Sequence, residues 1–252
     1  MRFRLPFRVL LMTLVGLCAS LASVFAQADP PSATPPPHRI AINLAARTLS
    51  ILQGERLLRT FPVGVGRLNF PTPTGEFQVI RKVVNPAWEN PYAGVQKMVI
   101  KAGSANPLGT RWIGFHRDAK GEFGIHGTNN PASVGKYSSH GCIRMRIPDA
   151  EAVFAAIDLG SPVSIAYDPA VIQRDGILLT LRVYPDALQR GMPNADAIQE
   201  RVRRQYPDAQ TNPLLIAYAL RRPSLPPTII GFIASREADK PKAASVQDAH
   251  KF

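Results

Sequence analysis

The chemistry of this sequence is concentrated in one segment, Gly124 to Met145, which reads GIHGTNNPASVGKYSSHGCIRM. It contains two histidines, His126 and His140, together with Cys142 and Arg144. A cysteine attacks as its thiolate, so a histidine and a group of backbone donors are the neighbours that a nucleophilic cysteine needs. The spacing between His126 and Cys142 allows a loop or hairpin to bring them together. We therefore predict a cysteine-based site in this segment.

The residues around Cys142 suggest further roles. If the chain is extended there, His140 and Cys142 point the same way, because side chains in a strand alternate. Gly141 removes bulk beside the sulfur, which lets the amides of residues 140–142 approach a developing oxyanion. Arg144 suits either a substrate carboxylate or an ordinary surface ion pair. A lone buried cysteine is the structural alternative for the whole segment.

Composition sets the broad class. The chain has 252 residues, of which 45% are apolar and 19% charged, so it is neither disordered nor collagen-like. Its formal net charge of +12 favours an anionic partner without choosing between nucleic acid, membrane and anionic polymer. Only two cysteines occur, Cys18 and Cys142, which excludes a disulfide framework.

The N-terminal segment has the pattern of a signal peptide over residues 1–28. Arginines occupy its start, Val9 to Val24 is apolar, and small residues precede a cleavage point after Ala26 or Ala28. The apolar run is shorter than a membrane-spanning helix needs, so cleavage is favoured over a retained anchor. We expect export to the periplasm or cell wall, with Cys142 as the only thiol of the mature chain.

The remaining chain divides by pattern. Residues 29–37 are a proline-rich spacer, and alternating apolar residues from Arg39 onward predict a mainly β domain over 38–184, with Pro169 as an earlier possible end. One short helix is predicted over 150–158 with Asp149 as its N-cap. A small helical C-terminal appendage over 185–235 is predicted from helices at 195–205 and 213–220, capped by Asn194 and Asn212. Residues 236–252 are predicted to be disordered.

The motifs together resemble a known family. HGT at His126 and SHGCIRM ending at Met145 are similar to the YkuD-type L,D-transpeptidases of bacterial cell walls, the ErfK/YbiS/YcfS/YnhG group. PVGVG from Pro62, TPTGEF from Thr72 and NPLGTRWIGF from Asn106 extend the resemblance. It covers about half of the chain and implies a β-sandwich-like catalytic domain with the cysteine in a narrow cleft.

The resemblance also implies roles for individual residues. Cys142 matches the nucleophile, His126 the histidine that activates it, and Gly127 the residue whose carbonyl orients the imidazole. Gly141 and Cys142 match the oxyanion donors, and Arg144 matches a substrate contact. Two further motif positions are Ser139 and His140, and His140 is expected to tune the site rather than to act as the base.

The implied reaction is acyl transfer through a thioester from a peptidoglycan tetrapeptide stem, with release of its terminal D-Ala. The acceptor stays open: a stem amine gives a 3→3 crosslink, a lysine anchors a lipoprotein, and water makes an L,D-carboxypeptidase. The resemblance implies no cofactor, no metal, no nucleic acid and no membrane span after signal cleavage. Two alternatives are a zinc peptidase built on His126, His140 and Cys142, and a wall-binding domain without turnover.

Overall fold

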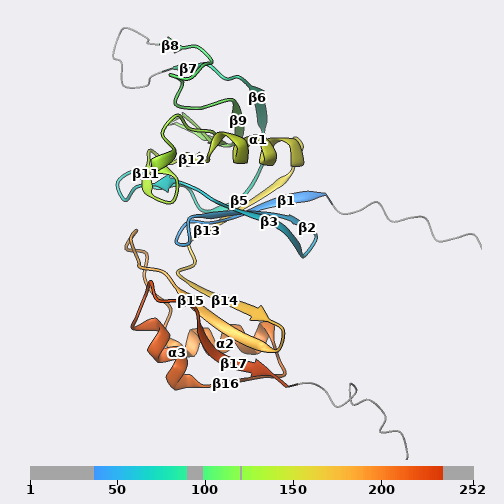
Figure 1. The fold of residues 1–252 in the computed structure, drawn as a ribbon, viewed down its shortest axis with the longest axis vertical. Helices are drawn as coiled ribbons and strands as arrows, with labels where there is room; N and C mark the ends of the chain where they lie inside the picture. The colour runs from blue at the N-terminus through green and yellow to red at the C-terminus, as the bar shows by residue number, and fades with distance from the viewer. Residues whose placement is uncertain (1–36, 90–98, 120, 235–252) are drawn as a thin grey trace, which may run out of the picture. The chain divides into compact units, whose positions relative to one another are not determined.

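The computed structural model describes residues 37–89, 99–119 and 121–234 (Figure 1). Strands dominate these residues, which confirms the predicted mainly β class. The first part of the described chain contains β1 (His38–Asn43), β2 (Thr48–Gln53), β3 (Arg56–Pro62), β4 (Val65–Gly66), β5 (Gly75–Gln78), β6 (Arg81–Val84), β7 (Trp88–Glu89), β8 (Val99–Ile100), β9 (Arg111–Asp118), β10 (Gly121–His126), β11 (Tyr137–Ser139), β12 (Ile143–Arg144), the helix α1 (Ile147–Ala156) and β13 (Pro162–Ala166).

One sheet of this part has five strands in the order β3-β2-β1-β13-β5. The alternation noted in the sequence places Ile40 and Ile42 of β1 on the buried face, opposite Val163 and Ile165 of the parallel strand β13. A tight turn at Gly54 and Glu55 joins β2 to β3, and Gln53 pairs with Arg56 across it. The buried side chains of these strands belong to one core cluster.

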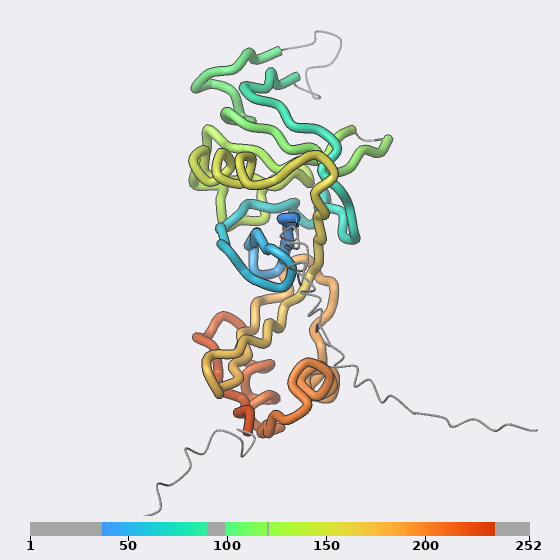
Figure 2. Tube along the Cα trace, turned by 90° about the vertical axis from the view of Figure 1, so that its right-hand side faces the viewer, coloured from blue at the N-terminus to red at the C-terminus, as the bar shows by residue number. Residues whose placement is uncertain are grey.

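A second sheet carries the site. Its four strands have the order β12-β10-β9-β6, and β10 ends at His126. Ile113 of β9, Ile125 of β10 and Ile143 of β12 are fully buried in the same core cluster as the β1 and β13 side chains. α1 packs against β9 and β10, which Figures 1 and 2 show as neighbouring elements. Two sheets that share one core form the expected sandwich-like arrangement.

The C-terminal part contains more strand than the sequence suggested. Its elements are β14 (Ala170–Asp175), β15 (Leu178–Val183), α2 (Ala195–Gln205), β16 (Ala209–Thr211), α3 (Pro213–Leu220) and β17 (Thr228–Ile233). The strands form one antiparallel sheet, β14-β15-β17-β16. Leu179 and Leu181 of β15 share a separate core with Ile198 of α2 and Ile216 of α3.

This strand pairing bears on the expected limit of the catalytic domain. A boundary at Tyr184 separates β15 from β17, its partner in the sheet, whereas the earlier end at Pro169 leaves the sheet intact. The appendage, expected to be helical, is an α/β unit in which the two helices cover a sheet (Figure 2). Local sequence patterns did not predict this sheet, because 44 residues separate β15 from its partner strand β17.

The helix ends test the predicted caps. Asn194 Oδ1 accepts a hydrogen bond from the Ala197 amide at 2.8 Å, and Asn212 Oδ1 accepts one from the Leu214 amide at 2.9 Å, so both caps are confirmed. The predicted cap at Asp149 is wrong. α1 begins earlier, at Ile147 with Arg146 as N-cap, because Pro148 is well tolerated in a first helical turn. Asp149 lies inside that turn, where its negative charge interacts favourably with the positive end of the helix dipole.

Replacing the confirmed cap Asn194 with alanine is expected to reduce the free energy of unfolding by about 1 kcal/mol, because the Ala197 amide loses its partner. Urea denaturation followed by circular dichroism measures this change. Gln205→Ala, at the other end of α2, is the matched control and should have a smaller effect. Equal effects of the two substitutions would contradict the capping assignment.

Several sequence predictions fall outside the described residues. They are the signal peptide over 1–28, almost all of the spacer over 29–37, and the disordered tail over 236–252. Among the residues that the structure does describe, no helix is both long enough and apolar enough to cross a membrane.

Candidate active site

The pairing of two strands brings His126 and Cys142 to one face of the sheet. β10 and β12 run parallel, with Ile125 opposite Ile143 and His126 opposite Arg144. Cys142 directly precedes β12, so by alternation its side chain shares a face with Arg144 and His126. The sulfur lies 4.0 Å from the Glu122 carbonyl oxygen on β10. The two residues that the sequence paired across a loop are therefore held by adjacent strands.

His126 is buried in one tautomer. Only 4% of the residue is exposed, and its Nδ1 lies 2.5 Å from the carbonyl oxygen of Gly127. A carbonyl can only accept, so Nδ1 carries the hydrogen and Nε2 keeps its lone pair. Burial lowers the pKa of His126 to about 4, opposed by the Gly127 bond and assisted by the positive charge of Arg144. His126 is therefore neutral near pH 7 and able to accept a proton.

Cys142 rests as a thiol. Burial raises the pKa of Cys142 above its ordinary value, although a hydrogen bond from the Gly124 backbone and the charge of Arg144 act in the opposite direction. The charge of Glu122 adds to the increase. A neutral thiol beside a neutral imidazole means that the proton moves during attack rather than before it.

A short network fixes the chain just before the cysteine. Gly141 has a φ of +112°, a conformation that favours glycine, and a Cβ there would overlap the Phe123 ring. The Gly141 amide donates to Ser139 Oγ at 3.0 Å, and Ser139 Oγ donates to the Cys142 carbonyl at 2.6 Å. The Gly141 amide is thus already engaged, so the expected oxyanion role would require this bond to break.

Thr72 connects this network to the loop between β4 and β5. Thr72 is only 1% exposed. Its hydroxyl accepts a hydrogen bond from the Gly66 amide at 3.0 Å and donates one to the Gly141 carbonyl at 2.8 Å. The hydroxyl therefore satisfies two buried backbone groups at once. The sequence marks Thr72 only as part of the TPTGEF motif and not as a residue of the site, because a threonine beside two prolines is also typical of an ordinary turn.

Thr72→Val is expected to reduce the free energy of unfolding by about 2 kcal/mol, since it leaves the Gly66 amide and the Gly141 carbonyl without their partner. It should also slow modification of Cys142, because the backbone before the sulfur is no longer fixed. Urea denaturation and the rate of thiol alkylation measure the two effects. Thr72→Ser retains the hydroxyl and should restore both; equal behaviour of the two variants would show that the hydroxyl is unimportant.

His140 does not point at the cysteine, which corrects the expectation that the two side chains face the same way. The left-handed turn at Gly141 breaks the extended chain, so alternation does not apply across it. His140 is exposed, its Nε2 accepts from an Arg67 guanidinium nitrogen at 2.7 Å, and its ring packs edge-on against Phe70. Burial, Arg67 and Arg144 lower its pKa. These contacts fit a tuning residue better than a base.

His140→Ala is accordingly expected to slow acylation of Cys142 by no more than about 10-fold, because general-base catalysis is retained at His126. Stopped-flow or mass-spectrometric acylation rates measure the effect. Arg67→Gln, which removes the charge that faces His140, is the matched variant and should have a similarly small effect. A loss at His140 as large as that at His126 would reverse the two assignments.

Arg144 lies within electrostatic reach of both proposed reacting groups. Its backbone is fixed by reciprocal hydrogen bonds with Gly64, each 2.8 Å long. Its side chain is half-buried. Its positive charge contributes to the lowered pKa of His126 and partly offsets the increase in the pKa of Cys142. Among the described residues, no carboxylate forms a salt bridge with it, unlike Arg81 or Arg201. The carboxylate-binding role expected for Arg144 stays a prediction.

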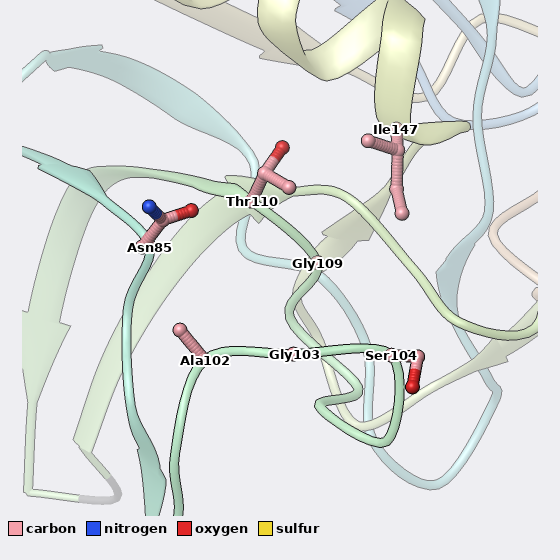
Figure 3. Close-up of a pocket in the computed structure, with 7 residues that line it drawn as sticks. All are labelled: Asn85, Ala102, Gly103, Ser104, Gly109, Thr110 and Ile147. Carbon is pink, nitrogen blue, oxygen red and sulfur yellow. The ribbon is translucent and has the colours of Figure 1, made fainter.

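A pocket of about 450 Å³ lies beside the loop that follows His126, and Figure 3 shows the residues that line it. Its seven lining residues are Asn85, Ala102, Gly103, Ser104, Gly109, Thr110 and Ile147. Gly109 packs directly on Gly127, where a Cβ on Gly109 would lie only 3.0 Å from the Gly127 Cα. The pocket therefore borders the loop that orients His126.

Within the described part of the chain, no three histidine, cysteine or acidic side chains are grouped so that they could hold a metal ion. The proposed zinc ligands also diverge, since His140 is turned toward Arg67 while His126 uses Nδ1 on Gly127. The seven sequence-predicted residues nevertheless occupy one region, at the ends of β10, β11 and β12.

The fold and the site define a class of protein: a mainly β domain with a cysteine and a neutral histidine on adjacent strands. Residues 37–165 match the family model for the YkuD L,D-transpeptidase catalytic domain, which is half of the chain. The chain belongs to this family.

Two relatives from Bacillus species agree with this assignment. YqjB of Bacillus subtilis is 40% identical over 134 residues, which cover 51% of this chain and 71% of that protein. YkuD of Bacillus licheniformis is 36% identical over 129 residues, so the chain spans just under two thirds, 66%, of its length. Among solved structures, L,D-transpeptidase 3 from Mycobacterium tuberculosis is 18% identical with a TM-score of 0.43, over 52% of this chain and 61% of that one.

Proposed function

We propose that this protein is a peptidoglycan L,D-transpeptidase that uses Cys142 as nucleophile and His126 as general base. The observation that carries the proposal is the neutral pair on β10 and β12, with Nε2 of His126 left as the acceptor by the Gly127 bond. Family membership supports the substrate class, peptidoglycan stem peptides. Transfer between amines needs no cofactor, because one amide bond is exchanged for another through a thioester intermediate and the two amides are nearly equal in energy.

The first half-reaction forms an acyl-enzyme. The Cys142 sulfur attacks the carbonyl carbon between the third stem residue and the terminal D-Ala, while its proton passes to His126 Nε2. The carbon–sulfur bond forms, the carbon–nitrogen bond breaks, and the proton on His126 moves to the leaving amine of D-Ala. Because the Gly141 amide is engaged by Ser139, the Cys142 amide is the better candidate for the oxyanion donor.

The second half-reaction transfers the acyl group. An acceptor attacks the thioester carbon and gives its proton to His126; the carbon–sulfur bond then breaks, and the proton moves from His126 to the leaving sulfur, which restores the thiol. A stem amine forms a 3→3 crosslink, a lipoprotein lysine forms an anchored protein, and water completes an L,D-carboxypeptidase reaction. Arg144 binds the stem carboxylate, since its half-buried charge lies close to both reacting groups. Export to the periplasm or cell wall, where the stems are, is part of the proposal.

One experiment separates this function from the two alternatives. The protein is incubated with imipenem, with and without a chelator, and its intact mass is measured. A β-lactam adduct on Cys142 that survives chelation is expected for the thiol enzyme. Loss of the adduct on chelation would indicate a zinc peptidase, and failure to form any adduct would indicate a wall-binding domain without turnover.

The natural acyl donor is then tested directly. Disaccharide-tetrapeptide is supplied alone, with a second stem, or with a lysine-containing peptide, and released D-Ala and products are separated by chromatography. Crosslinked dimers, peptide adducts and tripeptides identify the three acceptors. Absence of D-Ala release from a chain that forms the imipenem adduct would contradict the stem-peptide assignment.

A further inference from the structure

A group of residues that takes no part in the proposed steps lies directly behind His126. The Trp112 indole on β9 stacks on the imidazole, with ring centroids 5.6 Å apart and planes 17° apart. Trp112 is the residue paired with His126 in the β9–β10 ladder, and it is only 7% exposed. The indole therefore covers one face of the imidazole, while the Gly127 carbonyl holds its edge.

The indole is itself fixed by a carboxylate. Trp112 Nε1 donates to Glu122 Oε1 at 2.7 Å. The same carboxylate accepts from Arg81 Nε at 2.9 Å and from Arg117 Nη2 at 2.6 Å, and only 11% of its side chain is exposed. Burial alone would raise the pKa of Glu122, but the bonds from Arg117, Trp112 and Arg81 together lower it. The carboxylate is therefore ionised when it binds the indole.

Two glycines make room for this arrangement. Gly114 of β9 and Gly124 of β10 are partners in the ladder. A Cβ on Gly114 would overlap the Glu122 carboxylate, and one on Gly124 would lie 2.6 Å from the Trp112 ring. The sheet therefore carries no side chain at the two positions over which the Trp112 and Glu122 side chains lie. Gly124 also supports the Cys142 sulfur through its backbone, so indole, imidazole and sulfur share one small region of the sheet.

We propose that Trp112 and Glu122 form a positioning pair for His126, in which Glu122 fixes the indole through its N–H and the indole face fixes the plane of the imidazole. This inference rests on the proposed function, because it assigns His126 as the base. The Gly127 bond holds one ring nitrogen but permits the ring to tilt about that contact. The stack removes this freedom and keeps Nε2 directed at Cys142, which saves reorganisation during proton transfer.

The central test is a double-substitution cycle measured with imipenem. Trp112→Phe retains an aromatic ring but removes the N–H, and Glu122→Ala removes the acceptor. Each is expected to slow the acylation step by about 10-fold while the binding constant for imipenem stays unchanged. The double variant should be no slower than the slower single variant, because either substitution already breaks the same link.

Conservative and matched variants separate positioning from folding. Glu122→Gln retains an acceptor for the indole and should recover most of the rate. Glu151→Ala removes another carboxylate of the same part of the chain, one that accepts from Thr110 at 2.7 Å and pairs with Arg111 at 3.8 Å, and should leave the rate within about 2-fold. All rates are normalised to the folded fraction, measured by thermal denaturation.

A second readout does not depend on acylation. The groups that act on His126 are the Trp112 ring from β9, the Gly127 carbonyl and the charge of Arg144 on β12. Trp112→Leu opens one imidazole face to water without changing any charge. The pKa of His126, observed by NMR of the ring in the full chain, should then rise from about 4 toward its ordinary value of 6.5.

The outcomes are distinct. Losses that multiply in the double variant, or single variants within 2-fold of the wild type, would overturn the positioning pair. A wild-type chain that forms no imipenem adduct would overturn the proposed function instead. In that case the NMR titration decides the inference, because an unchanged His126 pKa in Trp112→Leu would show that the indole does not control the imidazole.

Discussion

Replacing Cys142 with alanine is expected to abolish both the imipenem adduct and the release of D-Ala from a tetrapeptide stem. The thiol is the only group in the motif that can form the thioester, and the mechanism has no bypass around that intermediate. The fold should survive, because Cys142 is only partly buried and its sulfur contributes only weak interactions, a 4.0 Å contact to the Glu122 carbonyl and a hydrogen bond from the Gly124 backbone. Intact mass, chromatography of released D-Ala and thermal denaturation measure the three quantities.

Cys142→Ser is the companion variant. Serine keeps the shape but offers a hydroxyl that neutral His126 activates far less readily than a thiol. We expect no adduct within the time that modifies the wild type completely. Retained D-Ala release in the alanine variant, with an unchanged melting temperature, would move the nucleophile elsewhere.

The second large effect is expected at His126. Alanine there should slow acylation by about 10²- to 10⁴-fold, the range that a general base contributes. His116→Ala is the matched control: this histidine lies on β9 in the same sheet, packs against Phe77 and Phe123, and has no assigned role. It should retain the wild-type rate within about 3-fold. Similar losses at both positions would indicate a general effect on the sheet rather than loss of a base.

The pH dependence makes the same assignment in a second way. Burial lowers the pKa of His126 to about 4, so the neutral base persists through mildly acidic solution and the wild-type rate should change little between about pH 5 and 7. Without His126, Cys142 reacts only after its thiol has ionised. The thiolate population rises about 10-fold per pH unit below the thiol pKa, and the rate should rise with it. A flat profile in His126→Ala would show that another group accepts the proton.

Local sequence patterns predicted what depends on neighbouring residues. Alternation located the strands, and the asparagine caps at 194 and 212 located two helices, because a cap acts within three residues of its own position. The motif also paired His126 with Cys142, and the structure has His126 on β10 and Cys142 directly before the adjacent strand β12. Alternation does not extend from His140 to Cys142, since Gly141, with a φ of +112°, interrupts the extended chain between them.

Contacts across the sheet were beyond such patterns. Nothing near Glu122 in the sequence marks it as the anchor of Trp112, because three of the groups that determine its state come from β6 and β9. Likewise, β15 lies within the limits predicted for the catalytic domain, and only its pairing with β14 and β17 assigns it to the C-terminal core. Long-range pairing, rather than propensity, decided these cases.

The protonated resting state of Cys142 has a consequence for the working life of the protein. Peroxides oxidise a thiolate first to the sulfenic acid, and oxidation beyond the sulfenic acid is largely irreversible. Burial raises the pKa of Cys142 and so keeps the resting sulfur protonated, the form that reacts slowly with peroxides. Under the proposed function the thiolate forms only as the sulfur attacks an acyl donor, so an exported Cys142 would be protected from oxidation between turnovers.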